Sequence, residues 1–170
     1  MSDKSLGDPF YGLAISYREA ADLLVGRGDG TIGLPIRFLY SHAFELFFKA
    51  FLRLNGITVE DLAKKKFGHN LAVLYEKCKE HGLSLDECDR KSLDILMPHL
   101  KDGHAKYQFR YFEKSFNTAD PKWMQRDIGK LAEAVSAEVE KRRQAMVDDA
   151  TKKGAVMVDI PIKMIVSIGD

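Results

Sequence analysis

Residues 32–54 form the most apolar segment of the chain, and their pattern constrains the fold more than any other feature. At about 100° per residue, most of the apolar side chains fill one half of a helical wheel, while Phe38, Phe48 and Leu52 lie on the other half. A helix that is apolar nearly all round is normally buried. The segment therefore predicts a central helix around which the rest of the chain packs.

Helical spacing also occurs on both sides of this central segment. Apolar side chains recur every three or four residues, and Pro9 and Pro121 are suited to the first turn of a helix. The helices predicted from these patterns cover about residues 9–27, 32–54, 71–81, 84–103 and 121–149, and a short helix begins at Thr58. Residues 104–119 have no clean period and are expected to form an irregular, partly exposed loop.

The end of the chain has a different pattern. In residues 155–170, Val, Ile and Met alternate with other residues, which is typical of extended chain. A lone strand has to pair with something, and a second copy of the chain is a natural candidate. A length of 170 residues suits one domain. The sequence therefore predicts an all-α domain over residues 1–154, followed by a short C-terminal β tail.

The composition and the missing motifs exclude several classes of protein. Two cysteines, Cys78 and Cys88, are too few for a disulfide scaffold, and no segment has the character of a signal peptide or a membrane span. The histidines form no metal-binding motif, and the phosphate-loop, hydrolase and kinase motifs do not occur. We therefore expect a cytoplasmic protein with no metal, no cofactor and no membrane partner.

Two short motifs carry a resemblance to a known family. The segment Glu45–Ala50 reads ELFFKA, and the segment Gly68–Leu71 reads GHNL. Both resemble motifs of the HEPN superfamily of small helical bundles, in which an acidic residue precedes a lysine by four positions and a Gly-His turn opens the following helix. The resemblance covers roughly residues 9–145 and implies a bundle of four or five helices that is commonly a homodimer.

The same resemblance implies a class of activity. Active members of the superfamily are metal-independent endoribonucleases of toxin and defence systems, which implies RNA or a nucleotide as the ligand and an antitoxin or a nucleotidyltransferase as a partner. Their signature is an arginine followed four to six residues later by a histidine, and Arg37 and His42 fit this spacing. These two residues are therefore the candidate catalytic pair.

The chemistry of such a pair is intelligible. An imidazole moves a proton during attack of a ribose 2′-hydroxyl on the adjacent phosphate, and a guanidinium holds the phosphate oxygens. Five helical steps place Arg37 and His42 about 140° apart, so they meet only if Arg37 reaches round the helix or comes from a second subunit. The alternative is structural, with His42 hydrogen-bonded at the edge of the bundle and Arg37 as a surface charge.

Other polar residues have both a binding and a structural interpretation. Single-stranded nucleic acid needs phosphate contacts and stacking rings, and the basic and aromatic segment after residue 104 offers both. The candidate nucleic-acid-binding residues are His69, Lys106, Arg110, Tyr111 and Lys114. In the structural interpretation this segment is a solvated loop, His69 caps its helix or pairs with Glu45, and Glu45 and Lys49 form an ion pair that organises the bundle.

The predicted function is that of an RNA- or nucleotide-associated domain of the toxin or defence type. The more specific prediction is metal-independent endoribonuclease activity. The alternative is a non-catalytic interaction or scaffold module that dimerises through the bundle and the terminal strands. A formal net charge of +1 does not decide between them. Basic residues nevertheless concentrate in residues 62–69 and 104–114, and these two patches favour an anionic partner if folding brings them beside Arg37.

Overall fold

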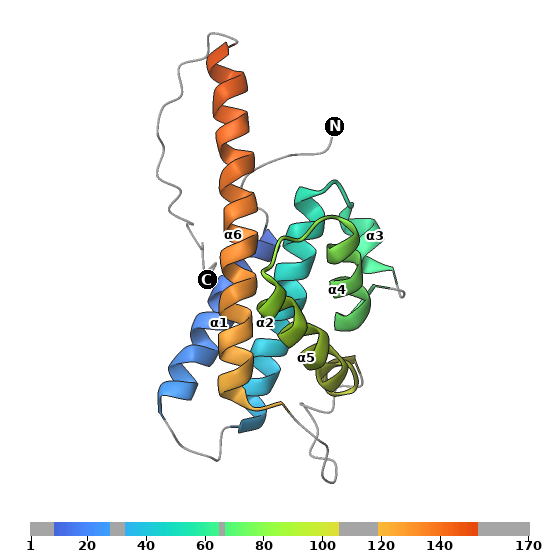
Figure 1. Cartoon of the computed structure of the whole chain (residues 1–170), viewed down its shortest axis with the longest axis vertical. Coiled ribbons are helices and arrows are strands. Elements are labelled where there is room, and N and C mark those ends of the chain that lie inside the picture. The colour runs from blue at the N-terminus through green and yellow to red at the C-terminus, as the bar shows by residue number, and fades with distance from the viewer. Residues whose placement is uncertain (1–8, 28–32, 65–66, 106–118, 153–170) are drawn as a thin grey trace, which may run out of the picture.

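The computed structural model of the chain describes residues 9–27, 33–64, 67–105 and 119–152, with side chains throughout these ranges except at 101–105. These residues form six helices and no strand (Figure 1). The helices are α1 (Pro9–Gly26), α2 (Gly33–Leu54), α3 (Val59–Ala63), α4 (Leu71–Glu80), α5 (Glu87–Ala105) and α6 (Pro121–Lys152). The all-α prediction is confirmed for these residues, whereas the predicted β tail at 155–170 lies outside them.

α2 is the centre of the bundle, as its apolar pattern predicts. Every residue from Ala43 to Phe48 is buried, and α2 packs against α1, α4, α5 and α6. A helix enclosed in this way needs an apolar side chain at nearly every position. This is why Phe48 and Leu52, which lie outside the main apolar half of the wheel, are fully buried all the same.

α1 and α2 form an antiparallel pair. Tyr11 of α1 meets Phe47 of α2 with ring centroids 6.1 Å apart, and Tyr17 meets His42 at 4.5 Å. Ala14 lies between the two tyrosines in the sequence of α1 and is fully buried, because its small side chain lets the helices approach closely. This register places the first half of α1 beside the part of α2 that carries the candidate site.

Asp22 of α1 forms hydrogen bonds with residues of α2 and α6. Its Oδ1 accepts hydrogen bonds from the Tyr40 hydroxyl at 2.6 Å and from Gln125 Nε2 at 2.9 Å. Burial, followed by the hydrogen bond to Asp22, raises the pKa of Tyr40 well above its ordinary value. The hydroxyl therefore remains a donor at neutral pH, and it joins α2 to α1 while Gln125 joins α6 to the same carboxylate.

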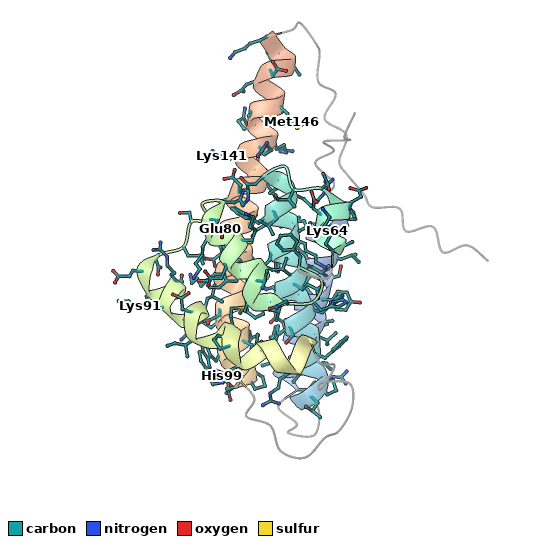
Figure 2. The ribbon with its side chains drawn as sticks, turned by 90° about the vertical axis from the view of Figure 1, so that its right-hand side faces the viewer. Lys64, Glu80, Lys91, His99, Lys141 and Met146 are labelled. Carbon is teal, nitrogen blue, oxygen red and sulfur yellow. The ribbon has the colours of Figure 1, made fainter. Side chains whose placement is uncertain are left out.

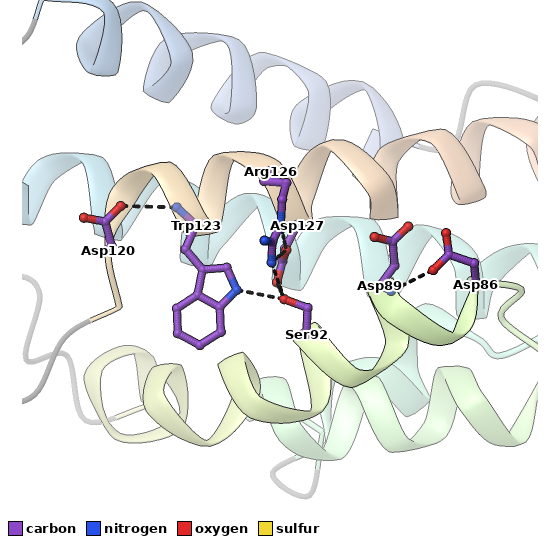
Figure 3. Close-up of polar contacts among 7 residues, drawn as sticks. All are labelled: Asp86, Asp89, Ser92, Asp120, Trp123, Arg126 and Asp127. Carbon is purple, nitrogen blue, oxygen red and sulfur yellow. Dashed lines mark hydrogen bonds and ion pairs between the residues drawn. The ribbon is translucent and has the colours of Figure 1, made fainter.

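A buried carboxylate, Asp127, joins α5 to α6 (Figure 3). Asp127 is 2% exposed, and it accepts hydrogen bonds from the Ser92 hydroxyl at 2.7 Å and from Arg126 Nε at 2.8 Å. The Ser92 oxygen in turn accepts from Trp123 Nε1 at 2.8 Å and from Arg126. We call these four residues the Asp127 cluster.

The largest differences from the predicted helix boundaries are at the start of α5 and the end of α6. α5 begins at Glu87 and not near Ser84, because Asp86 caps it: the Asp86 carboxylate accepts the amide of Asp89 at 2.8 Å (Figure 3). α6 continues to Lys152, about one turn beyond the predicted end. Helix ends depend on local capping contacts, and apolar spacing alone does not locate them.

Candidate functional site

One face of α2 carries a stripe of polar and aromatic side chains. Phe38, His42, Glu45 and Lys49 are spaced by four, three and four residues, so they lie one above the other on the helix. The stripe faces α1 on one side and, through His69, the turn before α4 on the other. We call His42, Glu45, Lys49 and His69 the Glu45 cluster.

Glu45 is the centre of this cluster. Its side chain is 2% exposed, and Lys49 Nζ lies 2.5 Å from Oε1. His69 Nδ1 lies 3.0 Å from Oε2 and 3.1 Å from Oε1, and His42 Nδ1 lies 3.8 Å from Oε2. A buried ionised carboxylate without partners is strongly unfavourable. The three basic side chains supply those partners, and His69 thereby fastens the turn before α4 to α2.

The turn that holds His69 is built by its neighbours in the sequence. Phe67 is buried and anchors the turn, and Gly68 has φ = 29°, in the left-handed region that favours glycine. The Asn70 side-chain oxygen accepts the amide of Val73 at 3.3 Å and caps α4. Of the two structural roles predicted for His69, the structure therefore shows the contact with Glu45, because Asn70 provides the cap.

Aromatic rings line the stripe along its length. Tyr17 of α1 meets the His42 ring edge-on, at 4.5 Å between centroids and 85° between planes. Phe38 stacks parallel to the same ring at 6.1 Å, and the Phe10 ring lies 6.0 Å from Lys49 Nζ. The contacts with Tyr17 and Phe38 hold the imidazole plane of His42 in place.

The cluster runs from a buried floor to an accessible surface. The exposed fractions of the side chains are 2% for Glu45, 12% for Lys49, 23% for His42 and 46% for His69. Each histidine turns Nδ1 towards the carboxylate, so Nε2 lies on the far side of its ring. Two imidazoles whose Nδ1 atoms lie near one carboxylate form an arrangement that can both accept and donate protons.

Arg37 lies at the start of α2 and faces a different neighbour. Its Nε donates to the carbonyl of Ala119 at 2.9 Å, and a Cβ placed on Gly33 would come within 2.7 Å of its guanidinium. Burial lowers the pKa of Arg37, while Asp120 raises it; a guanidinium stays charged at neutral pH regardless. Arg37 thus points to the start of α6 whereas His42 points to α1, as their angular separation on one helix requires.

The remaining predicted binding residues, Lys106, Arg110, Tyr111 and Lys114, lie outside the described residues. Within the ranges that are described, no group of His, Cys, Asp and Glu side chains is arranged to hold a metal ion. In the same ranges, no helix has the length and apolar character needed to cross a bilayer.

Two members of the site could not be recognised in the sequence. Tyr17 and Phe38 frame His42, but in the sequence they belong to ordinary helical apolar patterns. The spacing of Phe38 four residues before His42 is the only local signal that connects them. The contact with Tyr17 depends on how α1 docks on α2. A scan against family models and searches of curated proteins and solved structures found no significant match to this chain.

Proposed function

We propose that this chain is an RNA-associated domain of the HEPN type, acting as a homodimer in a toxin or defence system, and that the Glu45 cluster carries metal-independent cleavage of RNA. The observation that supports the proposal is the pair of imidazoles, from His42 and His69, whose Nδ1 atoms both approach one buried carboxylate. A surface that needed only charge neutralisation would be served equally well by lysine or arginine.

The proposed reaction uses the two histidines as a proton acceptor and a proton donor. One imidazole takes the proton of a ribose 2′-hydroxyl while the 2′-oxygen forms a bond to the adjacent phosphorus. The bond from phosphorus to the 5′-oxygen breaks, and the other imidazole, in its protonated form, gives its proton to that oxygen. The products are a 2′,3′-cyclic phosphate and a 5′-hydroxyl, so protons and electrons balance without a further reactant.

Lys49 and Glu45 support this reaction in different ways. Lys49 lies at the edge of the cluster and contributes positive charge near the phosphate, whose equatorial oxygens gain charge as the new bond forms. Glu45 accepts from Nδ1 of His69 and so directs Nε2 of that ring towards the substrate, while the Tyr17 and Phe38 rings hold the His42 ring. In the proposal Glu45 is a positioning residue, because its own carboxylate is buried below the imidazoles.

The aromatic residues of the stripe account for binding of a single strand. Phe10, Tyr17 and Phe38 are all half-buried and lie along the same side of the α1–α2 pair as the cluster. Bases of single-stranded RNA stack on such rings, whereas a duplex hides its base faces. Arg37, at the start of α2, contacts a phosphate further along the strand in this proposal.

The test is cleavage of a short, labelled single-stranded RNA in the presence of EDTA. We expect cleavage by the unmodified chain and a loss of about 100-fold or more in His42→Ala and in His69→Ala. DNA of the same sequence lacks the 2′-hydroxyl and should remain intact. His99→Ala is the matched control, because His99 is exposed on α5 and packs beside Trp123, away from the cluster. Equal RNA integrity with the unmodified chain and with the histidine variants would contradict the proposal.

A second function, a non-catalytic interaction module, is favoured by one observation. Lys49 and His69 bind Glu45 in a way that joins α2 to the turn before α4, as a purely structural cluster does. In that case expression of the unmodified chain and of His42→Ala should give the same cell growth and the same RNA pattern. The histidine variants would then differ from the unmodified chain only in stability.

A further inference from the structure

α6 reaches well beyond the rest of the bundle (Figures 1 and 2). It has 32 residues, against 22 in α2, which corresponds to about 48 Å of helix against about 33 Å. Arg142 donates to the carbonyl of Leu54, the last residue of α2, and beyond Arg142 only Val147 and Ala150 are half-buried while the others are exposed. We call residues 138–152 the α6 extension.

The apolar face of α6 does not end where the bundle ends. The residues of this face are buried as far as Val135. The same face continues into the extension with Val139, Met146 and Ala150, at spacings of seven and four residues. Met146 is 41% exposed and lies on the projecting part of the helix (Figure 2). An apolar stripe that is core at one end and presents an exposed methionine beyond the bundle is typical of a surface that another element covers.

A charged stripe runs beside the apolar one. Glu138, Arg142, Asp149 and Lys152 are spaced by four, seven and three residues, so they share one side of the helix with Ala145 at their centre. Their charges alternate from negative to positive along the helix. Reversing the direction of the helix reverses every sign, so the stripe is complementary to itself when two copies lie antiparallel.

We propose that a second copy of this chain docks on the α6 extension, with the two extensions antiparallel and related by a two-fold axis near Ala145. Glu138 then faces Lys152 of the partner subunit, and Arg142 faces Asp149 of the partner subunit. A closed two-fold interface requires one surface that is complementary to itself, and this charge order meets that requirement. Met146 lies next to the axis and packs against the partner's Ala145.

Glu138 and Arg142 also have contacts within one copy, and these contacts are weak. Glu138 lies 3.6 Å from Lys141, whose side chain is 79% exposed, and the Arg142 contact with Leu54 is also on the surface. Exposed pairs of this kind stabilise little, so they exchange for pairs across an interface. The surface includes no residue of the Glu45 cluster. The proposal therefore rests on the homodimer of the proposed function, for which it names the surface, and does not depend on the RNA chemistry.

The size of the surface sets the expected strength of the contact. The extension presents about four helical turns from each copy, which is less than a standard interface between proteins. A small but complementary surface corresponds to a weak, reversible dimer, and we expect a Kd of about 10–100 μM.

Sedimentation equilibrium of the full chain and of charge-reversed variants tests the proposal. Arg142→Glu with Lys152→Glu leaves only acidic side chains in the stripe, and Glu138→Lys with Asp149→Lys leaves only basic ones. Each double variant should raise the Kd at least about tenfold. An equimolar mixture of the two should form a one-to-one heterodimer, and a chain with all four reversals should dimerise like the unmodified chain.

Controls keep the result specific to the extension. Lys130→Glu with Glu133→Lys reverses an exposed pair of α6 outside the extension, whose atoms lie 3.0 Å apart, and should leave the Kd unchanged. Circular dichroism checks that each variant keeps its helix content. A chain that stays monomeric up to about 1 mM would overturn the proposal, whether the stripe is then covered by residues 153–170 or by another partner. A dimer with the same Kd in both double variants would overturn it as well.

Discussion

Glu45 and Asp127 are both carboxylates buried inside a helical bundle, at 1% and 2% exposure, and each is satisfied by basic and polar partners. The partners differ in kind. Asp127 binds a serine hydroxyl and an arginine, which keep their protons at every physiological pH. Glu45 binds Lys49 and His69, and His42 Nδ1 lies 3.8 Å from its carboxylate. An imidazole, unlike a serine hydroxyl or a guanidinium, can gain or lose a proton near neutral pH.

The difference shows how one physical demand leads to two kinds of site. Both carboxylates need compensation because burial removes their hydration. Fixed donors give the Asp127 cluster a permanent network that fastens α5 to α6 (Figure 3). In the Glu45 cluster, the accessible histidines are groups that can lose and regain a proton. The Asp127 cluster therefore serves the fold alone, whereas the Glu45 cluster serves the fold and also holds the histidines of the proposed chemistry.

The largest effect on stability is expected from Glu45→Ala. Removal of the carboxylate leaves the ammonium group of Lys49, 12% exposed, without its partner. Breaking a buried pair from one side lowers the free energy of unfolding by about 3–5 kcal/mol. Urea denaturation measures the change, and Glu133→Ala, whose carboxylate is 69% exposed, serves as the control. A loss no greater than that of the control would show that Glu45 is not needed for the fold.

Asp127→Ala should destabilise less, by about 2 kcal/mol. The Arg126 side chain is 59% exposed and stays hydrated when its partner is removed, so the cost comes mainly from Ser92 and Trp123. Hydrogen exchange should show faster opening of α5 against α6, with the turn before α4 protected as before. Equal losses of unfolding free energy in Asp127→Ala and Glu45→Ala would contradict the expected difference between the hydrated guanidinium of Arg126 and the buried ammonium group of Lys49.

Sequence patterns predicted the parts of this comparison that lie within one helix. The spacing of Glu45 and Lys49 predicts their ion pair, and the apolar period of α2 predicts its burial. Two partners distant in the sequence could not be assigned. Ser92 meets Asp127 across 35 residues, and the contact requires the packing of α5 on α6. His69 reaches Glu45 across 24 residues, and the sequence alone does not distinguish this contact from a helix cap.

Arg37 also shows that sequence patterns do not predict contacts between residues distant in the chain. A motif that counts residues places Arg37 and His42 together, but on one helix the two side chains point to different neighbours. The carbonyl that Arg37 contacts belongs to Ala119, at the end of residues 104–119, whose sequence carries no helical period. No local pattern connects a helix start to such a carbonyl, so this contact could not be predicted.

Tyr40→Phe extends the comparison to a third carboxylate, Asp22, whose donor, the Tyr40 hydroxyl, loses its proton only at alkaline pH. The folded chain raises the pKa of Tyr40, chiefly by burial, while the unfolded chain has the ordinary value near 10. The unfolded state therefore loses the proton first, and stability falls as the pH rises beyond about 10. Tyr40→Phe should lower the free energy of unfolding by about 1 kcal/mol at pH 7. In this variant the free energy of unfolding should fall less steeply as the pH rises beyond about 10. A parallel pH dependence in both chains would contradict this role.

Asn70→Ala should give the smallest change in stability, about 0.5–1 kcal/mol, because it removes only the cap of α4. Its effect on the Glu45 cluster should be larger than this loss indicates, since the cap fixes the turn that holds His69. The ring signals of His69 in an NMR spectrum should shift while those of His99 remain. Thr58→Ala removes the cap of α3 and is the matched control.

Cleavage of single-stranded RNA by His69→Gln and Ser92→Ala, measured beside the unfolding of both variants, tests the central claim most directly. Each substitution removes one partner of a buried carboxylate. We predict that His69→Gln loses cleavage by about 100-fold or more while remaining folded, and that Ser92→Ala is less stable but cleaves normally below its unfolding transition. Normal cleavage by His69→Gln, or equal losses in both variants, would contradict the division between a chemical cluster and a structural one.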